Sequence, residues 1–337
     1  MLVVAHDGLG CGTVHRAGEC ESDRRREEAP DHPGENRPVQ TTIPFMSALV
    51  LALLLLAPGA TRAHEAGHHE PDAEERALLS IVAAERALAQ DLSARATHAA
   101  ATRILARDAI VLGTERPAAR EAARAPQDRQ GTITREPAQI GLTRTHDLAY
   151  STGPYTRNRG HPSEGQGLFL TVWRRERNEW RIVLDTAVRT GASVDFVELG
   201  PAPRPSYAGK TSIEAARSQV QAREEALQRA RSATAPGSGA PPLRTLLADN
   251  VRLYRDGAAP VVGAMKVIDA WREHDDAAYQ RPQTLLIGNG ADLAVSHGAR
   301  KSKAAGDAYV HVWLRDQAGA WHLAFEVIPG TSTLADD

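Results

Sequence analysis

The second half of this chain repeats the order of motifs found in the first half, and this repeat limits the fold more than any other sequence feature. Segments of similar composition recur 140–145 positions later, each time in the same order. Such self-similarity indicates that one structural unit occurs twice, so we expect two copies of one domain. The matched segments are 147–153 with 292–298, 168–173 with 308–313, and 180–185 with 321–326.

Residues 46–63 resemble a secretory signal peptide. This segment, MSALVLALLLLAPGATRA, has an apolar stretch and ends on a small residue, Ala63, at the expected cleavage point. We predict that residues 1–45 are a non-native or disordered extension, that translation starts at Met46, and that a periplasmic or secreted chain begins at His64. The alternative is an apolar patch within a long N-terminal tail.

Composition excludes several classes of protein. A chain of 337 residues, 42% of them hydrophobic, is long enough for about two domains with buried cores. Lys and Arg number 40 against 42 Asp and Glu, so no basic surplus favours nucleic acid as a partner. The longest apolar run, 48–57, is about half the length that a membrane-spanning helix needs. Both cysteines, Cys11 and Cys20, precede His64, which leaves the exported chain without a disulfide or a thiol.

Each half is expected to begin with an amphipathic helix. Asp72 with Glu75, and Thr211 with Glu214, have the spacing of a capping box, in which the first side chain satisfies a free backbone N–H group. Apolar residues at helical spacing follow both pairs. The pattern therefore predicts helices that start at Asp72 and Thr211.

The remaining elements follow in the same order in both halves. Proline at every second position favours a semi-rigid extended linker between the halves. We expect short helices ending near 105 and 247, strands at 109–112 and 251–254, further helices at 117–125 and 263–273, the linker at 197–210, and a loop at 233–242.

Alternation along the predicted strands indicates sheets that are covered on both faces. Phe169, Thr171 and Trp173 share one face, and the residues between them, which share the other face, are also apolar. The strand around His311 has the same pattern. A sheet of this kind needs helices on one side and a partner surface on the other. We therefore expect the two halves to pack through their sheets as an intramolecular pseudo-dimer.

The closing strands of each half carry a family resemblance. Residues 170–185, LTVWRRERNEWRIVLD, and residues 310–326, from VHVWLR through Trp321 to Glu326, each place an aliphatic-Val-Trp strand before a turn and a Trp-x-aliphatic-x-x-acid strand. This arrangement resembles the nuclear transport factor 2-like superfamily, and within it the polyketide-cyclase-like and bacterial domain-of-unknown-function branch.

The resemblance implies an α+β fold with two tandem cone-shaped domains. Each would be a curved antiparallel sheet wrapped around about three helices, with a pocket opening between them. The expected chain order is a His-rich flexible tail at 64–71, a first domain at 72–196, the linker at 197–210 and a second domain at 211–332. Members of the superfamily include steroid isomerases, cyclases, dehydratases and non-catalytic domains, so the fold does not supply a function.

Steroid isomerase chemistry is disfavoured by the residues present. In those enzymes the resemblance implies an Asp base where this chain has Gly113 and Arg255, and neither residue can accept a proton at neutral pH. The first helices also lack the tyrosine that serves those enzymes as an oxyanion donor.

Two carboxylates are the candidate catalytic residues. Asp185 and Glu326 end the last strand of each half, and simple alternation places Arg181 and His322 on the same faces. A carboxylate half-buried in an apolar cone can have a raised pKa and act as an acid or a base. The alternative is that each acid caps the sheet edge or pairs with an arginine.

Further polar and aromatic residues are expected to line the pockets. Alternatively, His297, His311 and His322 of the second half could bind zinc or non-haem iron together with Glu326. The predicted pocket residues are Tyr150, Thr171, Trp173, Arg181, His297, His311, Trp313 and His322.

The predicted His-rich tail contains His64-Glu65-Ala66-Gly67-His68, which matches the H-E-x-x-H pattern of zinc proteases. Its place at a chain end, with a glycine inside it, favours a disordered tail, with loose metal binding by His64, His68 and His69 as the alternative. No cofactor motif is present in the sequence.

The sequence therefore predicts an exported two-domain protein that binds a small apolar or amphipathic ligand, or a protein partner, without catalysis. Two alternatives remain open. One is an isomerase, cyclase or dehydratase without a cofactor that uses a pocket carboxylate, and the other is an interaction scaffold.

Overall fold

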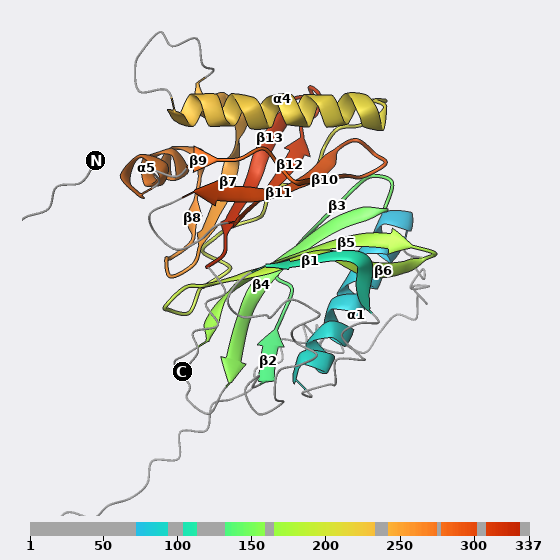
Figure 1. Cartoon of the computed structure of the whole chain (residues 1–337). Helices are drawn as coiled ribbons and strands as arrows, with labels where there is room; N and C mark the ends of the chain where they lie inside the picture. Colours follow the sequence, from blue (N-terminus) through green and yellow to red (C-terminus); the bar gives the residue numbers. More distant parts are fainter. Residues whose placement is uncertain are drawn as a thin grey trace, which may run out of the picture. The chain divides into compact units, whose positions relative to one another are not determined.

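The computed structural model describes residues 72–93, 104–112, 132–158, 165–232, 242–274, 278–301 and 308–330. The predicted signal peptide, the His-rich tail, the expected helix at 117–125 and nearly all of the loop predicted at 233–242 lie outside these residues. The described elements form an α+β fold with two mixed sheets, each with at least one packed helix (Figure 1).

The first half places one described helix, α1, against a six-stranded sheet. Its elements are α1 (Ala73–Ser93), β1 (Leu105–Leu112), β2 (Thr132–Arg135), β3 (Gln139–Leu142), β4 (Leu148–Asn158), β5 (Gln166–Glu176) and β6 (Glu179–Arg189).

The second half places two described helices, α4 and α5, against a seven-stranded sheet. Its elements are α4 (Ile213–Ser232), a short 3₁₀ helix (Leu243–Leu246), β7 (Leu247–Arg255), β8 (Val261–Val262), α5 (Ala264–His274), β9 (Ala278–Tyr279), β10 (Thr284–Ile287), β11 (Leu293–Lys301), β12 (Ala308–Arg315) and β13 (Trp321–Ile328). The predicted second helix at 263–273 is confirmed as α5.

The strand orders of the two sheets correspond, except that β8 adds a strand at one edge of the second sheet. The first runs β1-β6-β5-β4-β2, with β3 also on β4, and the second runs β8-β7-β13-β12-β11-β10, with β9 also on β11. In each sheet the first long strand pairs with the last one in parallel. The expectation of purely antiparallel sheets is therefore wrong for β1 and β7. A parallel pair needs a long crossover, and the remaining elements of each half provide it.

A β-bulge lies at the same place in both halves. Between β5 and β6 the register skips Val183, and between β12 and β13 it skips Ala324. One extra residue on one strand shifts every later side chain to the opposite face. The expectation that Arg181 shares a face with Asp185 is wrong for this reason, and the same holds for His322 and Glu326.

The helix caps agree with the sequence in the first half and differ in the second. Asp72 Oδ1 accepts a hydrogen bond from the backbone N–H of Glu75 at 2.8 Å, as the capping-box pattern predicts. In α4 the cap is Ser212 rather than Thr211, because Ser212 Oγ accepts a bond from the first turn at 3.2 Å. Thr211 instead accepts a bond from Arg315 Nη1 at 2.7 Å.

The buried apolar residues form three clusters. One lies between α1 and the first sheet, and a second lies between α4, α5 and the second sheet. The third contains residues of both sheets, including Leu170 and Val172 from β5 with Val310 and Val312 from β12. Trp173 and Trp313 belong to the helix-facing clusters, so the alternation predicted for these strands is confirmed.

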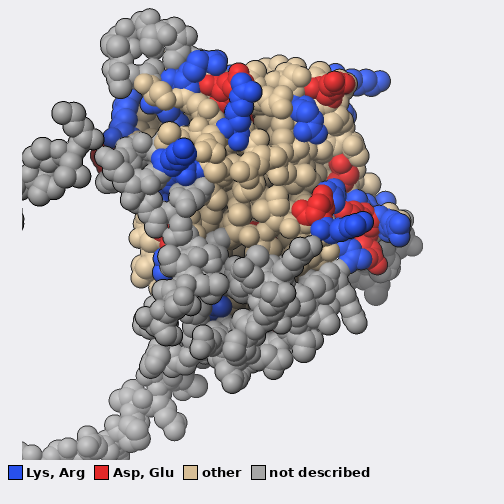
Figure 2. Space-filling model, in the orientation of Figure 1, with Lys and Arg blue, Asp and Glu red and all other residues tan. Residues whose placement is uncertain are grey.

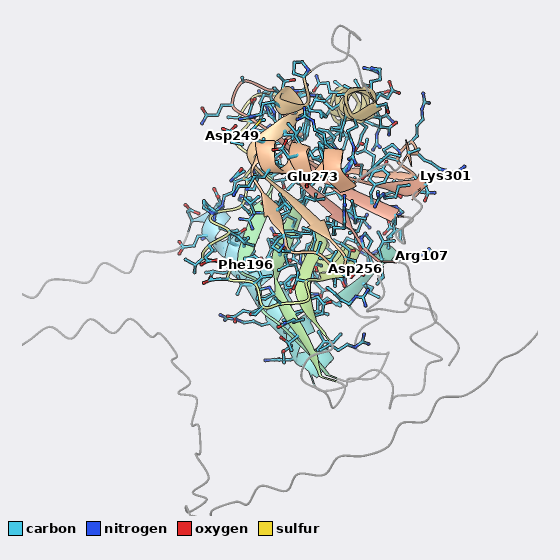
Figure 3. The ribbon with its side chains drawn as sticks, turned by 90° about the vertical axis from the view of Figure 1, so that its left-hand side faces the viewer. Arg107, Phe196, Asp249, Asp256, Glu273 and Lys301 are labelled. Carbon is cyan, nitrogen blue, oxygen red and sulfur yellow. The ribbon has the colours of Figure 1, made fainter. Side chains whose placement is uncertain are left out.

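The surface carries charges of both signs. Figure 2 shows Lys and Arg interspersed with Asp and Glu over the described part of one face, and Figure 3 shows Arg107 and Lys301 at the outer edge of the ribbon. Neither long helix of the described residues has a stretch apolar enough to cross a membrane.

Two glycines at equivalent positions give a matched stability prediction. A Cβ at Gly153 would collide with the backbone carbonyl oxygen of Glu136, whereas one at Gly298 would meet the phenol end of Tyr309, 2.6 Å from its oxygen. Backbone cannot yield as a side chain can, so we expect Gly153→Ala to cost about 3 kcal/mol and Gly298→Ala about 1 kcal/mol. Urea unfolding of both variants tests this order, and equal losses would contradict it.

Candidate functional site

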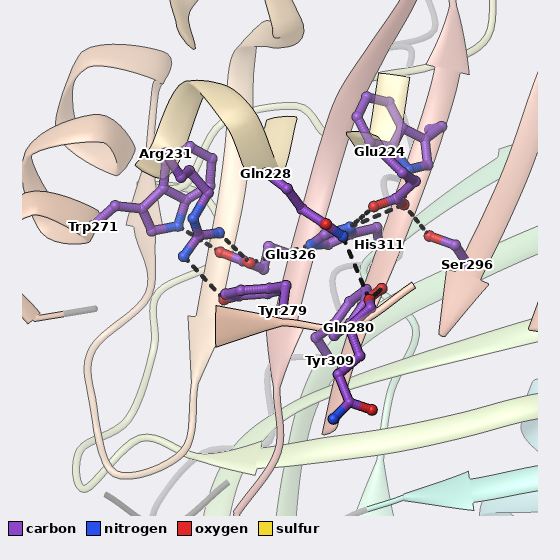
Figure 4. Close-up of polar contacts among 11 residues, drawn as sticks. Glu224, Gln228, Arg231, Trp271, Tyr279, Gln280, Ser296, Tyr309, His311 and Glu326 are labelled. Atoms are coloured by element: carbon purple, nitrogen blue, oxygen red, sulfur yellow. Dashed lines mark hydrogen bonds and ion pairs between the residues drawn. The ribbon is translucent and has the colours of Figure 1, made fainter. Parts of the chain in front are cut away.

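A buried imidazole links two acids in the second half (Figure 4). His311 lies on β12 between Glu224 of α4 and Glu326 of β13, and all three are at most 1% exposed. His311 Nδ1 lies 3.1 Å from both carboxylate oxygens of Glu224, and Nε2 lies 3.2 Å from Glu326 Oε1. The first helix and the last strand of this half are thus joined through one side chain.

Glu224 is held by two further donors. Trp313 Nε1 donates to Glu224 Oε1 at 2.6 Å, and the hydroxyl of Ser296 donates to the same oxygen. A buried carboxylate needs such donors, since an unpaired one carries a large desolvation cost. The position of Glu224 on α4 is therefore fixed by β11 and β12.

Glu326 is surrounded by a second set of partners. Arg231, near the end of α4, donates to its Oε1 from Nη1 at 2.9 Å, and Trp271 of α5 donates to Oε2 from Nε1 at 2.5 Å. Arg231 Nη2 also donates to the hydroxyl of Tyr279 at 3.0 Å. These contacts bring α4, α5 and β9 to one carboxylate.

The three titratable groups of this cluster stabilise one another in their charged forms. Burial alone would lower the pKa of His311, but the charge and hydrogen bond of Glu224, with the bond to Glu326, raise it to about 9. Burial alone would raise the pKa of Glu326, but the charge of Arg231 and the hydrogen bond from His311 outweigh it and hold this pKa far below its usual range. The pKa of Glu326 is therefore not raised as a catalytic acid would need, and its pairing with Arg231 agrees with the alternative given for this residue.

The pKa of Glu224 is also set by burial on one side and by its charged partners on the other. Burial raises its pKa, yet the His311 charge and the hydrogen bonds from His311, Ser296 and Trp313 outweigh that effect and lower it. The cluster therefore consists of a cationic imidazole between two carboxylates at neutral pH.

The first half holds an equivalent cluster built around arginine. Arg135, at the end of β2, donates from Nη2 to Glu85 of α1 at 3.0 and 2.9 Å and to Thr171 at 2.6 Å. Its Nη1 donates to Asp185 of β6 at 3.2 Å, and its guanidinium lies 3.7 Å from the centre of the Phe169 ring. Thr171 occupies the place of His311, so an arginine from another strand supplies the cation.

Both halves share the same support for the helix acid. Glu85 accepts bonds from Ser151 and from Trp173 Nε1, the latter at 3.1 Å, just as Glu224 does from Ser296 and Trp313. The helix acid, serine, tryptophan and strand acid are therefore common to both halves, and the cation differs.

The structure brings together some of the predicted site residues. Asp185, Thr171 and Trp173 meet in the first half, and Glu326, His311 and Trp313 meet in the second. Both strand acids are at most 3% exposed and paired with a cation, as the alternative reading predicted for an acid with an arginine partner.

Other predicted residues lie elsewhere. Tyr150 belongs to the cluster shared by both sheets, where its ring meets Phe325 with ring centres 5.0 Å apart. Arg181 pairs with Glu179 near the surface, and His322 Nε2 lies 2.9 Å from an Asp316 oxygen. His297 is half-buried on β11, and burial lowers its pKa.

The two helix acids were missed at the sequence level, although their spacing marks them. Glu85 falls four residues after Ile81 and three before Leu88, in the middle of a buried stripe, and Glu224 falls in the same way between Val220 and Leu227. An acid at such a position requires a buried partner. No local pattern marks Arg135, Arg231, Trp271 or Tyr279, because their role depends on how distant elements pair.

Among the described residues, no group of three His, Cys, Asp or Glu side chains lies close enough to hold a metal ion. His64, His68 and His69 lie outside these residues, as does Gly113. Arg255 ends β7, where it pairs with Ile328 of β13 in the sheet register.

No protein-family model and no curated protein matches this chain. Among solved structures it is similar to a nuclear transport factor 2-like protein of unknown function from Shewanella oneidensis, 13% identical over 33% of this chain and 97% of that one, with a TM-score of 0.28. A protein of the same description from Pseudomonas putida is 17% identical over 37% and 93%, with a TM-score of 0.30. A proposed dehydratase of that family from Streptomyces avermitilis is 13% identical over 34% and 96%, with a TM-score of 0.29. At these values the similarities carry no argument about the activity of this chain.

Arg135 gives a first stability prediction for the clusters. Its side chain is 3% exposed and neutralises two buried carboxylates, so Arg135→Met should cost about 3–5 kcal/mol. Arg181→Met is the matched control, since Arg181 and its partner Glu179 are 30% and 67% exposed, and it should cost less than about 1 kcal/mol. Urea unfolding measures both, and similar losses would contradict the difference in burial.

His311 gives a prediction for pH dependence. Its pKa in the folded chain, about 9, exceeds the usual 6.5, so its contribution is complete below pH 6.5 and is lost as the pH rises through 9. The difference corresponds to roughly 3 kcal/mol. We expect His311→Thr combined with Glu224→Gln, which removes the imidazole together with the acid whose pKa it lowers, to remove this pH dependence from urea unfolding measured between pH 6 and 9.5. His322→Thr, at a partly exposed site, is the control, and an unchanged slope in the double variant would contradict the assignment.

Proposed function

We propose that this chain is an exported protein of two tandem nuclear transport factor 2-like domains that binds a small ligand or a protein partner without catalysis. In this proposal the mature chain starts at His64, the domains span 72–196 and 211–332, and 197–210 links them. The shared strand order of the two sheets and the repeated Trp motifs support the two-domain assignment.

The observation that best supports a function without catalysis is that the buried acids are paired with cations. Between the helix and the sheet of each half, the charged groups contact one another through hydrogen bonds and ion pairs. A general acid must hold a proton near neutral pH, and a general base must be able to accept one there. Glu326, with its strongly lowered pKa, does neither efficiently. This disfavours the isomerase, cyclase or dehydratase alternative.

The two halves are proposed to form an intramolecular pseudo-dimer. Asp292 Oδ2 accepts a bond from the backbone N–H of Arg144 at 2.9 Å, and Asp147 Oδ2 accepts one from that of Asn289 at 2.8 Å. Asp147 corresponds to Asp292, and Arg144 to Asn289, with the same spacing. Reciprocal contacts of this kind are expected at a two-fold interface, and the apolar cluster with residues of both sheets also supports this proposal.

The linker is held by the same interface. Gly200 O accepts bonds from Gln139 Nε2 of the first half at 2.6 Å and from Arg252 Nη2 of the second at 2.5 Å. The hydroxyl of Tyr150 donates to Pro203 O. These contacts support a linker that fixes one pairing of the halves rather than a free tether.

Native mass spectrometry of the chain purified untagged from the periplasm tests the proposal. We expect a monomer that begins at His64 and carries a non-covalent small molecule, because the pseudo-dimer already covers both sheets. The denatured mass of the same sample separates a bound molecule from a covalent change. A chain that retains residues before His64 would contradict the export. A homodimer would contradict the pseudo-dimer. A monomer without an adduct would favour the scaffold, and conversion of the bound molecule on incubation would favour the enzyme.

A further inference from the structure

The second cluster contains one more cation than is needed to join its two acids. His311 contacts both Glu224 and Glu326, and Arg231 forms a further ion pair with Glu326. In the first half a single cation, Arg135, contacts both acids. The link between helix and strand in the second half therefore does not require Arg231, although the charge of the second carboxylate still requires a cation nearby.

Arg231 occupies an aromatic cage. Its guanidinium carbon lies 4.3 Å from the centre of the Trp271 ring and 4.1 Å from that of Tyr279. Glu326 closes the cage with its carboxylate, which Trp271 Nε1 holds in place at 2.5 Å (Figure 4). Aromatic faces beside a carboxylate are the arrangement with which proteins bind organic cations.

The walls of this cage belong to other elements than the helix that supplies the cation. Trp271 lies on α5, Tyr279 on β9 and Glu326 on β13, whereas Arg231 is the penultimate residue of α4. Helix ends fray more readily than helix centres. The Arg231 side chain is 10% exposed, compared with 3% for Arg135. Arg231 is therefore the member of the cluster best placed to leave it.

We propose that Trp271, Tyr279 and Glu326 form a binding site for a small organic cation with a guanidinium or alkylammonium group, and that Arg231 is its resident occupant. A ligand cation takes the place of the Arg231 guanidinium between the two rings and pairs with Glu326. The proposal of this site rests on the proposed binding function. It adds the chemical class of the ligand that the second half would bind.

The first experiment removes the occupant from the full chain. Arg231→Ala is titrated with methylguanidinium, and binding is followed by tryptophan fluorescence and by the rise in melting temperature. We expect saturable binding, at least tenfold tighter than to the intact protein, because the arginine no longer competes. Arg229→Ala, an exposed position in the same turn of α4, is the matched control and should bind as the intact protein does.

The second experiment asks whether the intact protein releases Arg231. Methylguanidinium and tetramethylammonium are titrated into the unaltered chain, where we expect weaker but saturable binding that is lost in Trp271→Phe and in Glu326→Gln. Binding to Arg231→Ala with none to the intact protein would overturn the proposal, since Arg231 would then be a permanent structural group. Absence of binding to either protein would overturn it as well.

Two further measurements distinguish a failed cation site from a misfolded variant and from a failed binding function. Circular dichroism shows whether Arg231→Ala is folded, and Arg231→Lys, which keeps a smaller cation in the cage, replaces it if it is not. A neutral or anionic adduct in the native mass spectrum would contradict the cation site and leave the binding function intact. A clean mass together with saturable methylguanidinium binding would support the site and show that the natural ligand is lost on purification.

Discussion

A carboxylate buried beneath a helix needs a cation and hydrogen-bond donors, and in both halves of this chain that need ties the first helix to the last strand. Glu85 and Glu224 have no exposure beyond 1%, and each lies in an otherwise apolar stripe. Without partners, each would carry a desolvation cost larger than the net stability of many domains. The strand order, the position of the tryptophans and the orientation of the helix must all agree with this contact.

The two halves meet this requirement with cations of different chemistry. The first half uses the guanidinium of Arg135, whereas the second uses the imidazole of His311, whose pKa is raised by the two carboxylates beside it. The second half therefore has a titratable group where the first has Thr171. It also has a second cation, Arg231, whose side chain is more exposed than that of Arg135, although both strand acids are buried.

Much of this fold could be predicted from the sequence, because its signals are local or repeated. The capped helix at Asp72, the helix α5 and the alternating strands follow from spacing alone. The bulges at Val183 and Ala324 do not, because they depend on how neighbouring strands pair, and they reverse the face expected for Arg181 and His322. The aromatic cage was missed for a similar reason, since α5 and β9 meet only in the folded chain.

Residues that recur in both halves are those that the fold requires, whereas residues that differ between the halves are free to serve a function. Asp147 and Asp292 make reciprocal contacts, and the helix acid, serine and tryptophan recur on both sides, so these positions serve the architecture. Where the halves differ, as at Thr171 and His311, the source of the cation that pairs with the buried acids differs as well. One chain that contains both copies can therefore alter one interior while the other keeps the interface stable. If the proposed binding function holds, the residues that distinguish the second half, rather than those that the halves share, are for this reason where we expect a specific ligand to be recognised.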